Sequence, residues 1–171
     1  MRSVDVCLTH QDFDNYDHKG KIVVVIDVLR ATSTINTLLF LGADHVRPIG
    51  SLEECKSLKD HDYIIMAERL GKKVEGFDYG NSPTKLTEKD IKGKKVAIAT
   101  SNGSKAIIKS EGSEMTILCS FLNIESVINR IKKSESDVIL LCSGWLGKTN
   151  LEDTLCACLL YTSDAADERL R

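Results

Sequence analysis

The sequence predicts an α/β fold, a mostly parallel sheet with helices on both of its faces. Short apolar runs rich in Val and Ile alternate with helical patterns along most of the chain. That alternation is typical of right-handed βαβ units. Residues 22–26 are apolar without interruption, as expected for a strand that is buried on both faces.

Strands are expected where such runs are bounded by turn-forming residues. In chain order they are residues 4–8, 22–26, 45–49, 63–67, 95–100, 115–119 and 138–142. Pro48 lacks a backbone N–H, so the third strand is expected at an edge of the sheet.

Helices are expected where apolar residues recur at a spacing of three or four. In chain order they are residues 34–41, 52–58, 102–110 and 124–131. Gly42 is a natural stop for the first helix, and Asn150 is a candidate cap for a final one. Residues 68–93 break the alternation with several glycines and many charges, which predicts a long functional loop.

Length and charge narrow the function classes. The chain has 171 residues, the size of one ordinary domain, and its 23 basic and 25 acidic residues give a net charge of −2. This balance and the 5% aromatic content argue against a nucleic-acid partner. No apolar run approaches the ~18 residues of a membrane span, and the N-terminus lacks a signal-peptide pattern. We expect a cytoplasmic protein without a membrane partner; a homo-oligomer stays open.

The last residues are expected to be foreign to the protein. Residues 158–168 resemble the translation of a transposase-type sequencing adapter, although a polar native terminus is the alternative. We therefore expect residues 158–171 to be a non-native tail, as in a fusion scar. The α/β domain is then residues 1–157, truncated and incomplete at its C-terminus.

Polar residues follow the predicted strands, at the ends where open α/β sheets bind ligands. In Thr100-Ser101-Asn102-Gly103-Ser104 a strand ends, a small polar turn follows and a helix begins. Backbone N–H groups, hydroxyls and an amide in this arrangement can cradle a phosphate. A plain helix cap with a turn glycine is the alternative.

Three further segments carry candidate groups. Asp27, at a strand tip, is a typical hard-metal ligand, and Arg30 can clamp a phosphate; the alternative is a surface Asp–Arg pair. Residues 76–83 are dense in turn formers, and Glu152-Asp153 stand near a helix start, where acidic residues are common in any case. The four histidines lie in polar segments and are expected at the surface.

Together these segments resemble the 2-phosphosulfolactate phosphatase family. The resemblance covers about residues 4–157 and rests on four ordered motifs: residues 27–34, 76–83, 100–104 and 151–153. Ser143-Gly144 fits the family's small-residue turn, while Ser101 and Ser104 stand where the family often has Thr. It implies a magnesium-dependent α/β hydrolase that converts 2-phospho-3-sulfolactate to 3-sulfolactate and phosphate, a step of coenzyme M biosynthesis.

The resemblance also implies a set of site residues. Asp27, Glu152 and Asp153 would hold one Mg²⁺, directly or through water. Asp27, Arg30 and Asp78 would be catalytic, with a metal-bound water, Asp27 or Asp78 as the nucleophile. Arg69 would pair with the sulfonate or carboxylate of the substrate. The substrate-binding set is Ser33, Thr34, Arg69, Asn81, Ser82, Thr100, Asn102, Gly103, Ser104 and Asn123.

Two other functions stay open. The chain could hydrolyse another small phosphorylated carboxylic acid, or bind phosphorylated anions without hydrolysis. The carboxylates of Asp27 and Asp153 favour an enzyme, because anion capture alone gains nothing from acidic groups beside a phosphate.

Overall fold

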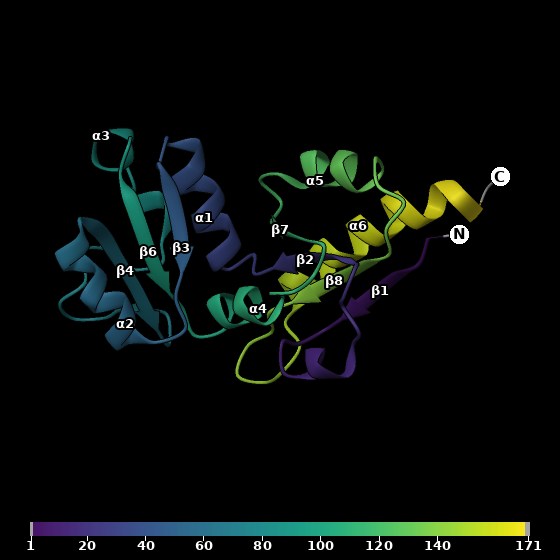
Figure 1. The fold of residues 1–171 in the computed structure, drawn as a ribbon, viewed down its shortest axis with the longest axis horizontal. Helices are drawn as coiled ribbons and strands as arrows, with labels where there is room; N and C mark the ends of the chain where they lie inside the picture. Colours follow the sequence, from purple (N-terminus) through teal and green to yellow (C-terminus); the bar gives the residue numbers. More distant parts are fainter. Residues whose placement is uncertain (1, 170–171) are drawn as a thin grey trace.

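The computed structural model describes the backbone of residues 2–169 and the side chains of residues 2–163. These residues form two four-stranded sheets where the sequence predicted one (Figure 1). The first sheet holds, in spatial order, β1 (Val4–Cys7), β8 (Val138–Cys142), β2 (Ile22–Ile26) and β7 (Met115–Cys119). The second holds β3 (His45–Pro48), β6 (Lys95–Ala99), β4 (Tyr63–Arg69) and β5 (Lys72–Lys73). The α/β class is confirmed, since every strand pairing is parallel except that of β4 with β5.

The second sheet is an excursion between β2 and β7 of the first. The chain leaves the first sheet after β2, builds all four strands of the second, and returns through β7 and β8. Helices α1 (Ala31–Phe40) and α4 (Gly103–Lys109) contact both sheets. Ile107 of α4 packs against buried clusters of both, so the two sheets share a core without sharing hydrogen bonds.

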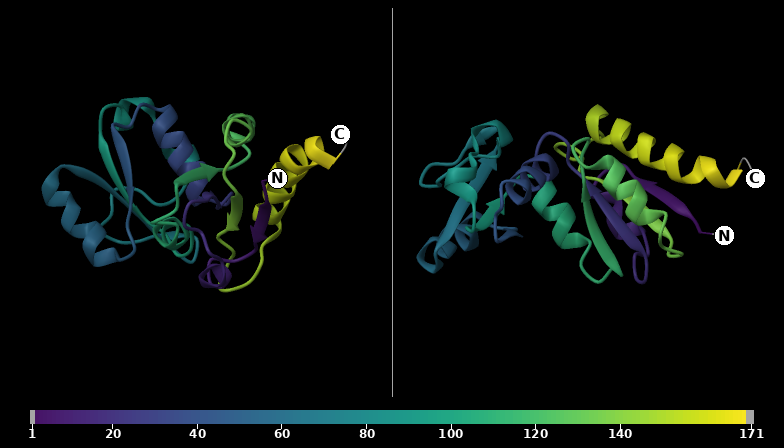
Figure 2. Two further views of the ribbon diagram at one scale, coloured as in Figure 1. Left: turned by 45° about the vertical axis from the view of Figure 1, so that its right-hand side comes forward. Right: turned by 90° about the horizontal axis from the view of Figure 1, so that it is seen from above.

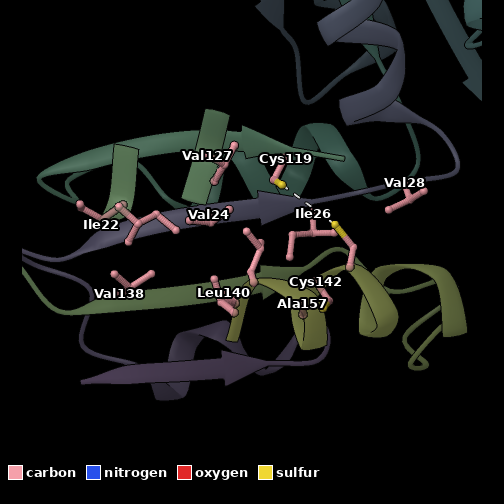
Figure 3. Close-up of a cluster of buried hydrophobic side chains, with 13 residues drawn as sticks. Ile22, Val24, Ile26, Val28, Cys119, Val127, Val138, Leu140, Cys142 and Ala157 are labelled. Carbon is pink, nitrogen blue, oxygen red and sulfur yellow. Dashed lines mark hydrogen bonds between the residues drawn. The ribbon is translucent and has the colours of Figure 1, made fainter. Parts of the chain in front are cut away.

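The first sheet is covered on both faces, as predicted. Alternate residues of β2 point into two buried clusters, which explains its uninterrupted apolar run. Helices α5 (Ile124–Ile131) and α6 (Leu151–Arg169) cover one face (Figure 2). Figure 3 shows that cluster, which gathers side chains from three strands and these two helices. A short 3-10 helix, η1 (Asp12–Asn15), and α4 cover the other face.

The second sheet is also covered on both faces. Helix α1 and the short α3 (Glu88–Ile91) pack on one side, and α2 (Leu52–Ser57) packs on the other together with Phe77. Strand β3 is an edge strand, as Pro48 predicted.

The structure differs from the predicted helices in two features that bear on the site. Helix α1 begins at Ala31, three residues before the predicted start, because Asp27 Oδ1 accepts the Ala31 N–H at 3.0 Å. Helix α6 begins at Leu151 as predicted, but Asn150 Oδ1 has no hydrogen-bond partner among the described residues. The expected side-chain cap by Asn150 is therefore not formed.

The predicted loop at residues 68–93 is built from short elements. It contains the end of β4, the hairpin strand β5, a 3-10 helix η3 (Pro83–Lys85) and α3. Within the described residues, none of the helices has the length and apolar character that a bilayer crossing requires.

The described part of α6 extends beyond residue 157. The adapter origin of residues 158–171 concerns the coding sequence and stays a prediction. The side chains of residues 164–171 lie outside the described residues.

Candidate active site

A polar pocket lies where the carboxyl ends of four parallel strands meet. It receives the segments that follow β2 and β8 of the first sheet and β4 and β6 of the second, and its volume is about 80 Å³. Its lining residues are Asp27, Leu29, Arg30, Glu68, Gly71, Asn81, Thr100, Ser101, Asn102, Gly144, Trp145, Asn150 and Glu152. Polar groups that follow the strands therefore lie together, as predicted, and they come from both sheets.

Asp27 is buried at the exit of β2 and is held from several sides. Its Oδ1 accepts the Ala31 N–H, and its own N–H donates to Thr32 Oγ1 at 3.1 Å. Thr32 Oγ1 donates in turn to Cys119 O at 2.6 Å. Burial and the nearby charge of Asp153 raise the pKa of Asp27 to about 7.

Gly103 allows α4 to begin directly against Asp27. A Cβ at this position would overlap the Asp27 carboxylate and the Ala31 side chain. The glycine of the 100–104 motif is thus required by this close approach, at a φ that other residues also adopt. Its predicted place at the site is supported by contact with Asp27.

Asp153 lies beneath the pocket and is fully buried. Its Oδ1 accepts the Val28 N–H at 2.8 Å, and its Oδ2 accepts from Ser143 Oγ at 3.1 Å and the Gly144 N–H at 3.3 Å. Burial raises the pKa of this carboxyl. Asp153 thus joins the exits of β2 and β8, and it does not itself line the pocket. Its neighbour Glu152 lines the pocket.

The 100–104 turn divides into an inner and an outer part. Ser104 Oγ accepts the Thr100 N–H at 3.0 Å, and Thr100 Oγ1 accepts the Ser104 N–H at 2.9 Å. Ser104 Oγ also donates to Ile98 O. The hydroxyl and the backbone N–H of Ser104 therefore both stabilise the turn. Ser101 and Asn102 line the pocket instead, and the Asn102 side chain makes no capping hydrogen bond to α4.

Arg30 and Glu68 enter the pocket from different sheets. Arg30 precedes α1, and its guanidinium donates to Gly71 O at 3.1 Å. Glu68 is buried and accepts the Gly71 N–H. Arg69 follows Glu68 on β4, and adjacent strand residues point to opposite faces. Its guanidinium donates to Glu68 O and Ala99 O, so the structure does not bring Arg69 into the pocket.

Asp78 and Ser82 lie beside the pocket, along a groove that adjoins it. Asp78 accepts from Lys59 Nζ at 2.8 Å and from the Ile65 N–H at 3.0 Å. Partial burial raises the pKa of Asp78, but these two donors outweigh it and hold the pKa below its ordinary value. Asp78 therefore pairs with the second sheet and does not face Asp27, while Asn81 lines both the pocket and the groove.

Three other predicted residues are used away from the pocket. Ser33 Oγ donates to Val28 O at 2.7 Å, and Thr34 is buried within α1. Asn123 is tied to the exit of β7 through Leu118 O and the Ser120 N–H. The structure does not bring these side chains to the site.

The expectation that all histidines lie at the surface is wrong for His10. It is buried, and its Nδ1 lies 2.7 Å from Ser143 O. Burial lowers its pKa, so the ring packs as a polar part of the core near the exit of β8.

Seven lining residues were not in the predicted set, and four of them carry polar or aromatic side chains: Glu68, Ser101, Trp145 and Asn150. Glu68 and Ser101 directly follow predicted strands, and this position is the signal that identifies them. Asn150 was interpreted as a cap, but its buried Oδ1 lacks a partner among the described residues. Trp145 is largely exposed at the pocket rim, and nothing in its local sequence distinguishes it.

Carboxylates of the kind that bind Mg²⁺ line the pocket, and they include Glu68 in addition to the expected Asp27 and Glu152. Asp27, Glu68 and Glu152 all line the pocket, whereas Asp153 has its oxygens occupied. Among the described residues, no group of three or more His, Cys, Asp or Glu side chains is close enough to enclose a metal. Mg²⁺ needs only one or two protein carboxylates, because it retains waters and binds substrate phosphates.

Comparison with known proteins gives a consistent result. A sequence model of the 2-phosphosulpholactate phosphatase family matches residues 7–168. A protein of Caldanaerobacter subterraneus subsp. tengcongensis named "Probable 2-phosphosulfolactate phosphatase" is 41% identical over 157 residues, which are 90% of this chain and 65% of that protein. A protein of the same name from Clostridium acetobutylicum is 38% identical over 90% of this chain and 67% of that protein. Another from Clostridium novyi is 35% identical over 95% of this chain and 72% of that protein. The chain thus spans about two thirds of the length of these relatives.

Proposed function

The chain belongs to the 2-phosphosulpholactate phosphatase family, and on that premise we propose that it is a magnesium-dependent phosphatase. Its substrate is 2-phospho-3-sulfolactate, and its products are 3-sulfolactate and phosphate, as in the coenzyme M type of pathway. It acts in the cytoplasm. The observation that carries this proposal is the convergence of Asp27, Arg30 and Asn102 in one polar pocket at the strand exits.

The charges of the pocket support a bound divalent cation. Three carboxylates, those of Asp27, Glu68 and Glu152, face a pocket with one lining cation, Arg30. A phosphate ester would be repelled by this set unless a cation neutralised it. One or two of these carboxylates, Asp27 among them, would hold Mg²⁺, and the bound ion would withdraw charge from the phosphoryl oxygens.

The remaining lining groups orient the phosphoryl group. Arg30 is held in place by its bond to Gly71 O and can donate further N–H groups to phosphoryl oxygens. The Asn102 amide and the Ser101 hydroxyl offer neutral donors in the same pocket. Hydrolysis replaces the ester P–O bond with a P–O bond to water, and the water proton passes to the leaving alkoxide.

The raised pKa of Asp27 links cation binding to proton release. Burial and the charge of Asp153 keep this carboxyl partly protonated near pH 7. A cation must displace that proton, so Mg²⁺ affinity is expected to increase as the pH rises through about 7.

The test is phosphate release from 2-phosphosulfolactate by the 171-residue chain, first with Mg²⁺ and then with EDTA. We expect release that EDTA abolishes. The Clostridium acetobutylicum relative serves as an assay control. The exposed Asp60→Asn variant should behave as wild type, whereas Asp27→Asn should be inactive.

The alternatives have distinct outcomes. Faster release from another phosphorylated carboxylic acid in the same assay would contradict the substrate assignment. Tight binding of phosphorylated acids by folded protein without phosphate release, while the relative is active, would contradict the enzyme assignment.

A further inference from the structure

A larger groove continues from the candidate active site. Its volume is about 430 Å³, and it shares Arg30, Gly71 and Asn81 with the pocket. The pocket, at about 80 Å³, is several times smaller. A pocket of that size suits a phosphoryl group and its cation, so the carbon skeleton of a substrate must extend beyond it, and the groove is the adjoining space.

The groove has more positive than negative side chains, with Asp78 as the one acidic residue in its lining. Lys73 and Lys85 line it together with Arg30. Lys73 Nζ donates to a backbone oxygen, that of Asp78, at 3.2 Å. The Asp78 carboxylate is engaged by Lys59 and the Ile65 N–H. Among the described side chains Lys73 and Lys85 form no ion pair, although the Asp78 carboxylate lies close enough to Lys73 for their charges to interact.

Asn81 is a second, independent indication of a ligand. Only 4% of the residue is exposed, and its Oδ1 has no hydrogen-bond partner among the described residues. Leaving a buried amide oxygen unpaired is unfavourable, and an amide offers both donors and an acceptor. Because Asn81 lines both cavities, a ligand that spans them would satisfy it.

The backbone is shaped to bring Asn81 beside Lys73. A Cβ on Gly80 would lie 3.1 Å from Lys73 Cβ and 3.3 Å from Lys73 Cα. A side chain at this position would require this segment or β5 to shift by a few tenths of an ångström. The junction of the two cavities is therefore a packed part of the fold.

From these observations we infer that the groove binds the non-transferred anionic end of the substrate through Lys73 and Lys85, with Asn81 at the junction. This inference rests on the proposed function and extends it. The ligand class is a small phosphate ester whose carbon skeleton carries a further carboxylate or sulfonate. The groove takes the role that the sequence had suggested for Arg69, which points to the other face of β4.

The test compares Lys73→Gln, Lys85→Gln and the double variant with Lys72→Gln. Lys72 is the exposed neighbour of Lys73 on β5 and lines neither cavity, so this control removes the same charge from the same strand. Phosphate release is measured from 2-phosphosulfolactate and from p-nitrophenyl phosphate, which lacks a second anionic group. We expect each groove variant to raise KM for the first substrate roughly 3- to 10-fold, with little change in kcat. KM for the second substrate should not change.

Equal effects of Lys72→Gln, or equal effects on both substrates, would overturn the inference. Binding of 3-sulfolactate, measured by calorimetry, is a readout that needs no turnover. Wild type should bind it at least about 10-fold more tightly than the double variant. No binding by wild type, or equal binding, would overturn the inference even if phosphate is released. Selective binding without phosphate release would leave it standing and remove the proposed function.

Discussion

The pocket and the adjoining groove hold their polar groups in different ways. In the pocket, Asp27 is buried and fixed by backbone N–H groups and by the close approach of Gly103. In the groove, Lys73 and Lys85 are exposed on short elements of the excursion after β4. Strand exits of packed sheets can hold charges rigidly for chemistry, whereas an exposed segment can vary its charges at little cost to the fold.

The largest expected contrast is between two aspartates. Asp27→Asn should lower kcat/KM for phosphate release by about 10³-fold or more, because it removes a pocket charge while keeping the shape of the side chain. Asp78→Asn, beside the groove, should stay within about 3-fold of wild type. Steady-state kinetics with Mg²⁺ checks both values. Equal losses would show that Asp78 belongs to the catalytic group.

The second contrast is between two glycines. Gly103→Ala should cost about 2–4 kcal/mol of unfolding free energy, because the added methyl overlaps Asp27 and Ala31 in a packed region. Gly80→Ala would bring a methyl to 3.1 Å from Lys73 Cβ, a longer approach than the overlap at Gly103, and should cost about 0.5–1.5 kcal/mol. Urea denaturation monitored by circular dichroism measures both. A smaller loss of unfolding free energy for Gly103→Ala would mean that α4 does not pack tightly against Asp27.

The third contrast is between Asp27 and an asparagine of the same shape but without charge. The pKa of Asp27 is about 7 in the folded protein against an ordinary 3.8, so the folded state binds this proton more tightly. That stability is fully present below about pH 4 and is lost as the pH rises from there through about 7. In EDTA, Asp27→Asn should melt roughly 3–8 °C above wild type at pH 8 and close to it only at about pH 4.

Magnesium should reverse the difference in melting temperature between wild type and Asp27→Asn at pH 8. It is expected to raise the Tm of wild type at pH 8 but not that of Asp27→Asn, which offers no charge to the ion. Thermal melts of both proteins with and without Mg²⁺ check this, with Asp60→Asn as the matched control. A similar Mg²⁺ shift in both proteins would place the ion elsewhere.

The smallest expected effect lies at the edge of the groove. Lys59→Gln removes the ion pair with Asp78, which is partly exposed, and should cost less than about 1 kcal/mol. The pKa of Asp78 is lowered, so this stabilisation is present above about pH 4 and is lost as the pH falls further. Urea denaturation at pH 7 with Lys89→Gln as control measures it. A larger loss of unfolding free energy would show that the Lys59–Asp78 ion pair contributes more to stability than a surface pair does.

Much of the fold could be predicted because the strands carry local signals. The apolar run of β2 and the Pro at the end of β3 predicted a buried strand and an edge strand, and both are confirmed. The division into two sheets was not predicted. Each segment is equally consistent with one sheet or two, and only packing of α1 and α4 against both sheets separates them.

The candidate site divides in the same way. Position after a strand correctly brought Asp27, Arg30, Thr100 and Asn102 to one pocket, with Glu152 from the start of α6. The prediction chose Arg69 and did not include its neighbour Glu68. The alternation of β4 implies that these two point to opposite faces, but the sequence does not say which face meets the first sheet.

The sequence by itself determined which segments form strands, where their polar exits lie and to which family the chain belongs, because these depend on local patterns and ordered motifs. Tertiary structure alone decided which exits meet. Burial engages both oxygens of Asp153 with protein donors, brings the pKa of Asp27 near neutrality and leaves Asn81 without a partner among the described residues. Those properties depend on the surroundings of a side chain, which residues distant in the chain supply.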